Sequence, residues 1–162
     1  MDTLLRSAAP SDAPAMLALL QSTSDEGDAL PFLGPLDQEF IRNQWLGAQG
    51  CVLACRDGEV LGMYRYGANM PGRGAHVSTA TFVVNRHARG QGIGRALVAH
   101  CLATATAAGY RAMQFNQVVS TNLAALALYR SLGFTEAGCI PDAFRHDRLG
   151  YLSAYILFRR LA

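Results

Sequence analysis

One stretch of this chain joins a predicted strand to a predicted helix through a turn rich in glycine and arginine: Val83-Val84-Asn85-Arg86-His87-Ala88-Arg89-Gly90-Gln91-Gly92-Ile93-Gly94-Arg95-Ala96-Leu97. The first turn of a helix has unpaired N–H groups and the positive end of the helix dipole, so anions bind there readily. Glycine at positions 90, 92 and 94 leaves no side chain to keep a diphosphate from the backbone. Arg89 and Arg95 can add charge-assisted hydrogen bonds to phosphate oxygens. The stretch therefore predicts a diphosphate site.

The spacing of these glycines excludes two other phosphate motifs. The dinucleotide fingerprint would need glycine at position 95, where the chain has Arg95. A P-loop would need lysine followed by serine or threonine after the last glycine, and neither is present. A tight turn with an exposed arginine and no ligand is the structural alternative.

Outward from this turn, the hydrophobic pattern predicts strands and helices in the order β-α-α-β-β-β-α-β-α-β-β. Asp57-Gly58 predicts a tight hairpin, and a polar loop is expected over Pro141–Gly150. The order predicts an α/β (α+β) fold, a mixed sheet with helices on both faces. Strands are expected over Leu4–Arg6, Cys51–Arg56, Glu59–Tyr66, Val77–Val84, Ala112–Val118, Phe134–Ile140 and Tyr151–Phe158, and helices over Ala13–Ser22, Asp37–Leu46, Ile93–Ala108 and from Thr121 or Asn122 to Leu132.

Composition limits the class of protein. At 162 residues, 51% apolar and 16% charged, the chain is expected to fold as a single domain over residues 1–162. A net charge of +2 is too small to indicate a nucleic-acid or membrane partner. The four cysteines show no zinc-ligand spacing, so no metal is expected. With no signal peptide and no bilayer-length apolar run, a cytoplasmic protein is expected.

Two segments carry a resemblance to a known family. Arg89-Gly90-Gln91-Gly92-Ile93-Gly94 resembles the (Gln or Arg)-x-x-Gly-x-(Gly or Ala) motif of the GCN5-related N-acetyltransferase (GNAT) superfamily, which cradles the pyrophosphate of coenzyme A. Many relatives have proline where this chain has Arg86. After a further strand, a segment resembles the second motif of that family, Asn122-Leu-Ala-Ala-Leu-Ala-Leu-Tyr129-Arg-Ser-Leu-Gly133-Phe134.

This resemblance implies the GNAT fold and its reaction. The fold is a central mixed, mostly antiparallel, seven-stranded sheet flanked by helices on both faces. A V-shaped splay between its fourth and fifth strands, here Val77–Val84 and Ala112–Val118, receives pantetheine. The co-substrate is acetyl-CoA, and a neutral amine attacks its thioester directly in a ternary complex. A homodimer is common in the family.

The resemblance also implies roles for particular residues. Tyr129 is expected to act as the general acid toward the departing CoA sulfur, because a phenol with a pKa near about 10 is a plausible donor to a thiolate. Backbone groups of Phe82 and Val84 are expected to face pantetheine and the thioester carbonyl. The cofactor-binding set is Phe82, Val83, Val84, Arg89, Gly90, Gln91, Gly92, Ile93, Gly94, Arg95, Asn122, Ala125 and Tyr129.

The general base is left open. Many relatives place a glutamate on the fourth strand, but Val77–Val84 contains no carboxylate. His76, Glu26 and His146 are candidates, although each is more typical of a solvated surface group, and a water chain is the other possibility.

The acceptor is expected to be the amine of a small molecule. Two loops typically determine specificity in this architecture, here Ser24–Phe32, with Glu26 and Phe32 as substrate contacts, and Pro141–Arg148. A weaker resemblance links the chain to the subgroup containing fungal acetyltransferases for proline analogues. It implies that Asn85 and Asn116 orient an amino-acid-like substrate through its carboxylate.

Three alternatives remain open at this stage. The chain could be a non-catalytic CoA-binding regulatory module. It could instead acetylate protein N-termini or lysines, including those of ribosomal proteins. A ping-pong route through Cys101 or Cys139 is chemically possible, but both cysteines lie in apolar periodic segments that favour core packing.

Overall fold

A computed structural model of the protein describes residues 2–161. Seven strands form one sheet in the order β1-β2-β3-β4-β5-β7-β6, and all neighbours are antiparallel except β4 and β5. The predicted mixed, mostly antiparallel sheet is thereby confirmed. The strands are β1 (Leu4–Ser7), β2 (Gly50–Arg56), β3 (Glu59–Ala68), β4 (Val77–Val84), β5 (Ala112–Val119), β6 (Thr135–His146) and β7 (Gly150–Arg160).

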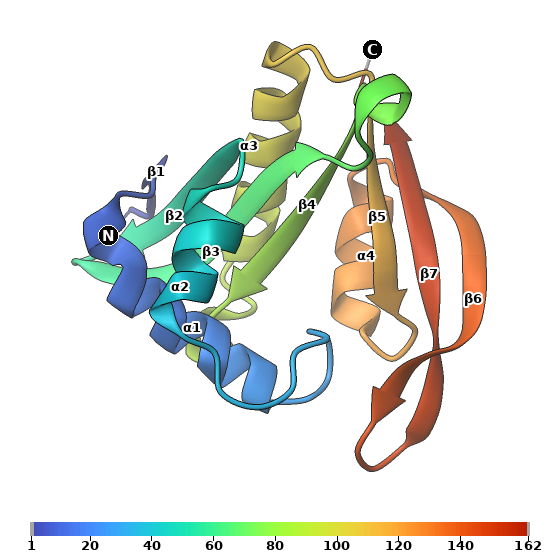
Figure 1. Ribbon diagram of the computed structural model, residues 1–162, viewed down its shortest axis with the longest axis horizontal. Coiled ribbons are helices and arrows are strands. Elements are labelled where there is room, and N and C mark those ends of the chain that lie inside the picture. Colours follow the sequence, from blue (N-terminus) through green and yellow to red (C-terminus); the bar gives the residue numbers. More distant parts are fainter. Residues whose placement is uncertain (1, 162) are drawn as a thin grey trace.

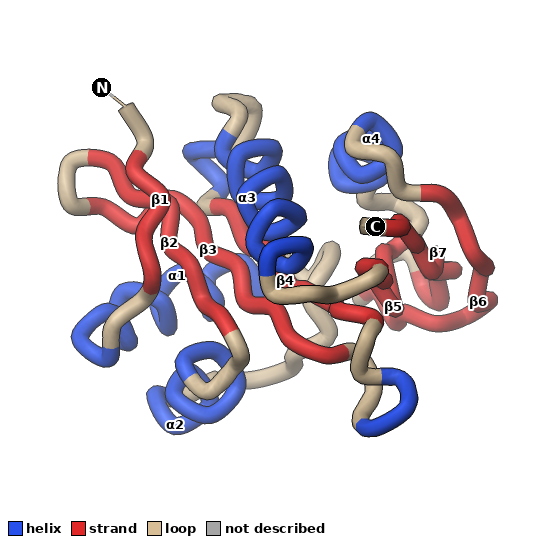
Figure 2. Tube along the Cα trace, turned by 90° about the horizontal axis from the view of Figure 1, so that it is seen from above, coloured by secondary structure: helices blue, strands red, loops and turns tan. Residues whose placement is uncertain are grey.

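Helices cover both faces of the sheet (Figure 2). One face carries α1 (Ala13–Asp25), α2 (Gln38–Phe40) and the π-helix η2 (Ile41–Leu46), and the other carries α3 (Ile93–Ala107) and α4 (Leu123–Ser131). The predicted helix at 37–46 is therefore a single α-turn, capped by Asp37, that continues as a π-helix. Short 3-10 turns occur at η1 (Pro10–Asp12), η3 (Gly72–Gly74) and η4 (Arg86–Ala88). No helix within residues 2–161 has the length and apolarity needed to cross a bilayer.

The parallel pair β4 and β5 is joined at only one end. Its register comprises Val77 opposite Ala112 and Ser78 opposite Met113, and the buried Ser78 hydroxyl donates to the Ala112 carbonyl at 3.0 Å. Beyond these pairs the two strands diverge, as Figure 1 shows. The sheet therefore consists of two arms, β1–β4 and β5-β7-β6, that separate from a common closed end.

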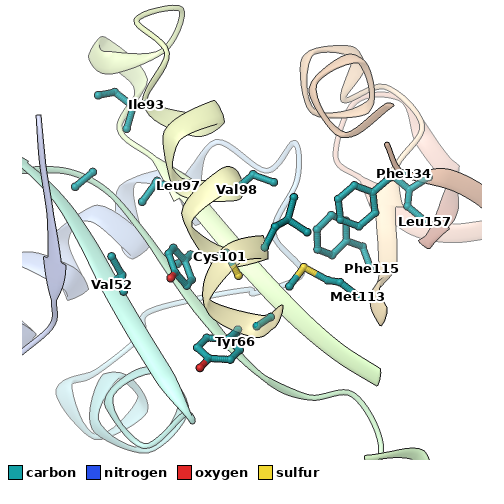
Figure 3. Close-up of a cluster of buried hydrophobic side chains, with 14 of the residues drawn as sticks. Val52, Tyr66, Ile93, Leu97, Val98, Cys101, Met113, Phe115, Phe134 and Leu157 are labelled. Atoms are coloured by element: carbon teal, nitrogen blue, oxygen red, sulfur yellow. The ribbon is translucent and has the colours of Figure 1, made fainter. Parts of the chain in front are cut away.

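Two apolar clusters fill the space between the sheet and its helices. Under α3, the buried side chains of Leu97, Val98 and Cys101 pack among residues of both arms, including Met113 and Phe115 of β5 (Figure 3). Under α1 and η2, Trp45 and its neighbours form the second cluster. The helices thus hold the two arms at a defined separation.

The predicted polar loop at Pro141–Gly150 is wrong. β6 continues to His146, and the turn before β7 is confined to residues 147–149. A register shift between Ile140 and Phe144 accommodates Pro141 and Asp142, which has a φ of +52°. Proline is tolerated here because β6 is the edge strand. The long hairpin places His146 in the interior rather than in a solvated loop.

Candidate functional site

A cavity of about 280 Å³ lies where β4 and β5 separate. Both strands contribute to its walls, and α4 closes it with Asn122, Ala125 and Tyr129. The loop after α1 covers it with Ala29, Leu30 and Pro31. The remaining lining residues are Arg65 of β3, Thr79, Ala80, Thr81 and Phe82 of β4, and Phe115, Asn116, Gln117, Val118 and Val119 of β5.

The edge of β4 inside the splay presents backbone groups that no other strand of residues 2–161 pairs with. In an antiparallel pair, every second residue exchanges hydrogen bonds with the partner strand. The Asn85 N–H donates to the Leu61 carbonyl, and the Asn69 N–H donates to the Val77 carbonyl, both at 2.8 Å. The backbone N–H and C=O groups of odd-numbered β4 residues therefore bond to β3. Those of even-numbered residues point toward β5. Beyond Ser78 these are Ala80, Phe82 and Val84.

This alternation divides the predicted cofactor contacts on β4. Phe82 and Val84 direct their N–H and C=O groups into the splay, as expected for residues that contact pantetheine. Val83 instead pairs with Met63 of β3, and its buried side chain belongs to the cluster under α1. Ala80 lines the cavity and has the same backbone direction as Phe82, but the sequence analysis did not select it.

The start of α3 is bare, as an anion site requires. The first helical hydrogen bond runs from the Ala96 N–H to the Gly92 carbonyl at 3.0 Å, so the three preceding N–H groups have no partner within the helix. Gly90 and Gly92 have φ values of +75° and +82°, and a Cβ at either would meet nothing within 4 Å. The space above these amides is open. Gly94 differs, because its Cβ would lie 3.5 Å from Leu128 of α4.

Other side chains of this loop are held by protein contacts. Gln91 donates to the His87 carbonyl at 3.0 Å and accepts from Arg56 at 2.8 Å. Arg95 donates to the hydroxyl of Ser131 on α4 at 2.8 Å. These bonds position the backbone around the open helix start.

Arg89 and Glu26, which the sequence analysis assigned to different ligands, bind each other. The guanidinium donates from both terminal nitrogens to the carboxylate at 2.8 and 2.9 Å, and its Nε donates to the Val84 carbonyl at 3.3 Å. A bidentate pair of this kind has a defined geometry. It ties the end of α1 to the loop that precedes α3.

Tyr129 lies at the centre of an aromatic group that spans the splay. Its ring centroid is 4.6 Å from that of Phe115 on β5 and 6.3 Å from that of Phe82 on β4. Burial, with a smaller contribution from Cys101, raises the pKa of the Tyr129 hydroxyl above the ordinary value of 10.0. The hydroxyl therefore keeps its proton to a higher pH than an ordinary tyrosine does. Asn122 caps α4 by accepting from the Ala125 N–H at 3.3 Å.

The three base candidates lie in different environments. His146 is only 6% exposed, which corrects the expectation of a solvated group. Its Nδ1 accepts from the backbone N–H groups of Arg148 and Leu149, so Nε2 carries the proton and donates to Asp28 at 2.9 Å. His76 is exposed and precedes the closed end of the splay, and Glu26 is bound to Arg89.

The residues predicted to contact the acceptor lie in two adjoining cavities and at the end of β4. Asn116 lines the cavity and donates to Asn69 at 2.6 Å, whereas Asn85 follows the far end of β4 and is not part of that lining. Phe32 lines a second cavity of about 380 Å³ between the loop after α1 and the β6–β7 hairpin. Leu30, Pro31 and Gln117 belong to both linings, so the two cavities adjoin.

Sequence analysis missed Arg65. The side chain donates to the Gln44 carbonyl at 2.9 Å and lies 5.8 Å from the ring centroid of Trp45. Burial lowers the pKa of its guanidinium. The available signal was strand alternation, since a cation two residues after Met63 in a strand shares the face of that apolar residue.

The cysteines do not favour a covalent route. Cys101 is fully buried, and burial raises the pKa of its thiol to about 12, so the nucleophilic thiolate is scarce. Cys139 is exposed on the edge strand β6, outside the cavity lining. Within residues 2–161 no group of three metal-ligating side chains comes together.

Comparison with known proteins agrees with this geometry. The model of the Acetyltransferase (GNAT) family matches residues 18–134. A GCN5-related N-acetyltransferase from Kribbella flavida is 37% identical and superposes with a TM-score of 0.92 over 98% of this chain and 97% of that one. A ribosomal-protein-alanine N-acetyltransferase from Brucella melitensis is 30% identical, with a TM-score of 0.86 over 97% and 99% of the two chains.

Two further relatives are more distant or longer. A phosphinothricin acetyltransferase (Pat) from Sinorhizobium meliloti, in complex with AcCoA, is 23% identical and has a TM-score of 0.90 over 100% of this chain and 90% of that one, which shows a common fold. N-acetyltransferase aca1 of Schizosaccharomyces pombe is 39% identical over 100 residues, 60% of this chain and 47% of the relative. The chain thus spans about half the length of this curated relative.

Proposed function

Because this chain belongs to the acetyltransferase (GNAT) family, we propose that it transfers the acetyl group of acetyl-CoA to the primary or secondary amine of a small molecule. One observation carries the proposal. The unpaired edge of β4 and the hydroxyl-bearing ring of Tyr129 line one cavity, and the bare start of α3 lies beside the far end of that edge, where a Cβ at Gly94 would be 3.8 Å from Val84. An extended pantetheine chain matches the free strand edge, and a diphosphate matches the open amides above Gly90 and Gly92.

Both backbone groups and side chains bind the cofactor. Backbone N–H groups of the segment from Gly90 to Arg95 hold the diphosphate. This segment includes Gln91, Ile93 and Gly94. Phe82 and Val84 bond the pantetheine arm, and Asn122 and Ala125 line its inner end. Arg89 acts mainly by holding the loop before α3 in place, because Glu26 already neutralises its charge.

Tyr129 supplies the proton that the reaction needs on sulfur. The amine nitrogen forms a bond to the thioester carbonyl carbon, and the carbon–sulfur bond breaks as the phenol donates its proton to sulfur. A Phe82 N–H aimed into the splay stabilises negative charge on the carbonyl oxygen. Of the described residues that line the cavity, none is a carboxylate, so the proton lost by the amine leaves through water, and water returns a proton to the Tyr129 phenolate.

The cover over the cavity favours a small acceptor. Leu30 and Pro31 lie across its acceptor side, and Asp28 ties this loop to the β6–β7 hairpin through His146. Asn116 and Phe32 line the two adjoining spaces that an acceptor can enter. Asn85, at the end of β4, remains a proposed substrate contact.

A second candidate is acetylation of a protein N-terminus. The relationship to the Brucella melitensis enzyme, whose name specifies ribosomal-protein alanine, favours it over lysine acetylation. It requires the Leu30–Pro31 cover to move aside for a peptide.

Release of free thiol from acetyl-CoA tests both candidates. We expect release with small amines and none with peptides bearing a free N-terminus. The reverse pattern would establish the second candidate, and coenzyme A binding without transfer to any amine would establish a regulatory module.

Location and assembly belong to the same proposal. We propose a cytoplasmic homodimer. The small net charge of +2 supports action without a nucleic-acid or membrane partner. Light scattering of the purified chain tests the dimer, and a mass equal to one chain would contradict it.

A further inference from the structure

Arg65 is the charged member of the cavity lining. Among the described residues that form the walls, every other side chain is apolar or neutral and polar. Arg65 stands on β3 directly opposite Thr81 of β4. It also shares a sheet face with Met63 and Val83, whose side chains pack under α1. The guanidinium therefore lies on the face of the sheet that α1 covers, opposite to the aromatic group around Tyr129.

No carboxylate of the described residues forms an ion pair with Arg65. In the part of the chain from residue 2 to 161, the ion pairs of 4.0 Å or less do not include it. The two acidic side chains that precede the cavity cover are engaged elsewhere, Glu26 with Arg89 and Asp28 with His146. A partly desolvated cation is costly, which agrees with the lowered pKa of this guanidinium, and arginine stays charged nonetheless.

The surroundings of Arg65 suit an incoming anion. An arginine side chain has five N–H donors. In Arg65, the nitrogen Nη1 uses one of them to donate to the Gln44 carbonyl. Thr79 and Thr81 add hydroxyls on the same face, and Asn116 adds an amide from the opposite arm. A carboxylate is the planar anion that pairs with a guanidinium through two parallel hydrogen bonds.

We propose that Arg65 binds a carboxylate of the acceptor, so that the substrates are amines that also carry a carboxylate, such as small amino or imino acids. The inference rests on the proposed acetyl transfer and narrows its substrate class. It disfavours polyamines, because a second ammonium group would meet the half-buried Arg65 cation. Arg65 is then a specificity-determining residue that the family motifs do not include.

A purely structural role for Arg65 makes different predictions. Its bond to Gln44 and its position over Trp45 could serve only to hold η2 against the sheet. In that case substitution would lower activity toward every acceptor to the same extent. A carboxylate-binding role affects only acceptors that have the carboxylate, and it acts through KM.

The test compares each acid with its carboxamide, using alanine with alaninamide and proline with prolinamide. We expect the wild-type chain to prefer the acids by at least about tenfold in kcat/KM, the value of one charged hydrogen bond. Arg65→Gln should remove that preference by raising KM for the acids while leaving the carboxamides within about twofold. Arg65→Lys should retain part of it. Arg42→Gln, an exposed arginine of η2, controls for the change in net charge.

The result that would overturn the proposal is an equal loss for acids and carboxamides in Arg65→Gln, or no preference in the wild-type chain. Thermal melts of each variant confirm folding. A binding measurement separates this inference from the proposed function. Calorimetric titration of alanine and alaninamide into the protein saturated with coenzyme A requires no turnover. Weaker binding of alanine to Arg65→Gln supports the carboxylate site even if no acetyl transfer occurs, and unchanged binding refutes it.

Discussion

At the scale of single residues, Tyr129 is the side chain whose chemistry the environment alters most directly. It is enclosed by aromatic rings from both arms, and burial raises the pKa of its hydroxyl above 10.0. An acid with a raised pKa keeps its proton to higher pH. The proposed general acid therefore stays competent where an ordinary tyrosine would begin to ionise.

We predict that Tyr129→Phe lowers kcat by about 100-fold, because general acid catalysis contributes on that scale. KM for acetyl-CoA should change little, since the ring remains. In the wild-type chain, kcat should not decline between pH 8 and 10 through Tyr129, because its raised pKa lies beyond that interval. Steady-state kinetics across this range check both expectations. Tyr151→Phe, an exposed tyrosine of β7, is the control, and an equal loss in that variant would contradict the role.

A second prediction at this scale concerns Gly92. Gly92→Ala should weaken binding of coenzyme A at least about tenfold, because the methyl group occupies the open space above the amides that hold the diphosphate. Gly109→Ala is a matched control, since Gly109 has a φ of +89° at the opposite end of α3 and open space around it. Both variants should lose about 1 kcal/mol of stability from positive φ. Calorimetry distinguishes them, and equal affinities would refute the diphosphate site.

At the scale of elements, α3 must lie close to the sheet for its first turn to face the proposed diphosphate site. A Cβ at Gly62 of β3 would lie 2.9 Å from a methyl of Leu97, 2.9 Å from the Val83 carbonyl and 3.2 Å from a methyl of Ile93. The absent side chain of Gly62 therefore sets the distance between α3 and β3. This distance connects a core position to the diphosphate site.

We predict that Gly62→Ala lowers the free energy of unfolding by about 1–3 kcal/mol, the range for inserting atoms into a packed core. Binding of coenzyme A should also weaken, because α3 must shift outward. Gly67→Ala on the same strand is the control, since its Cβ would make only ordinary contacts at 3.8 Å. Urea denaturation measures both variants. Equal stabilities would show that the sheet absorbs the methyl group without moving α3.

The segment after α1 connects elements that the sheet leaves apart. Glu26 bonds to Arg89 beside β4, and Asp28 bonds to His146 at the end of β6, with Gly27 at a φ of +71° between them. The two arms of the splay are thus tied at their open side by residues 26–28. Because Glu26 is bonded to Arg89 and Asp28 to His146, both acidic side chains position the cavity cover instead of attracting an amine.

We predict that Glu26→Gln raises KM for the acceptor about threefold to fivefold, and that its dissociation constant for coenzyme A changes less than twofold. The effect is modest because a partly exposed ion pair contributes about 0.2–1 kcal/mol. Arg89→Gln should match it, and the double variant should add nothing further. A large loss of coenzyme A affinity in Arg89→Gln alone would instead assign the guanidinium to phosphate.

At the scale of the whole molecule, the sheet is a pair of arms joined at one end. Two residue pairs hold β4 to β5, and beyond them the edge of β4 has no partner strand in the described part of the chain. A bound pantetheine chain would supply that partner along one side only. The other side of β4 is already satisfied by β3.

We predict a residue-by-residue pattern in amide hydrogen exchange. Saturation with coenzyme A should slow exchange at Ala80, Phe82 and Val84, whose N–H groups point into the splay, by about tenfold or more relative to the neighbouring odd positions. Thr81 and Val83 should change little, because their N–H groups are paired with β3 in the free protein. NMR-detected exchange resolves these sites. Uniform slowing along β4 would indicate general stabilisation rather than a ligand added at the edge.

Much of this architecture could be predicted from local pattern. The β-branched run Val77–Val84 is a strand with the predicted bounds, and Gly92 begins α3 where the glycine-rich turn ends. Family resemblance added the order of the strands and the splay. The edge hairpin was mispredicted, because Pro141 and Asp142 are typical of loops and only pairing with β7 shows them to be a bulge.

Local periodicity and backbone geometry thus determined most of the elements and the bare helix start, because each depends on residues a few positions apart, and the family resemblance selected Tyr129. Tertiary structure alone decided which charges meet. Glu26 and Arg89 are 63 residues apart in the chain, and Asp28 and His146 are 118 apart. Among residues 2–161, Arg65 has no carboxylate partner because the fold pairs Glu26 and Asp28 with other groups. No spacing rule relates positions that only the folded sheet brings together.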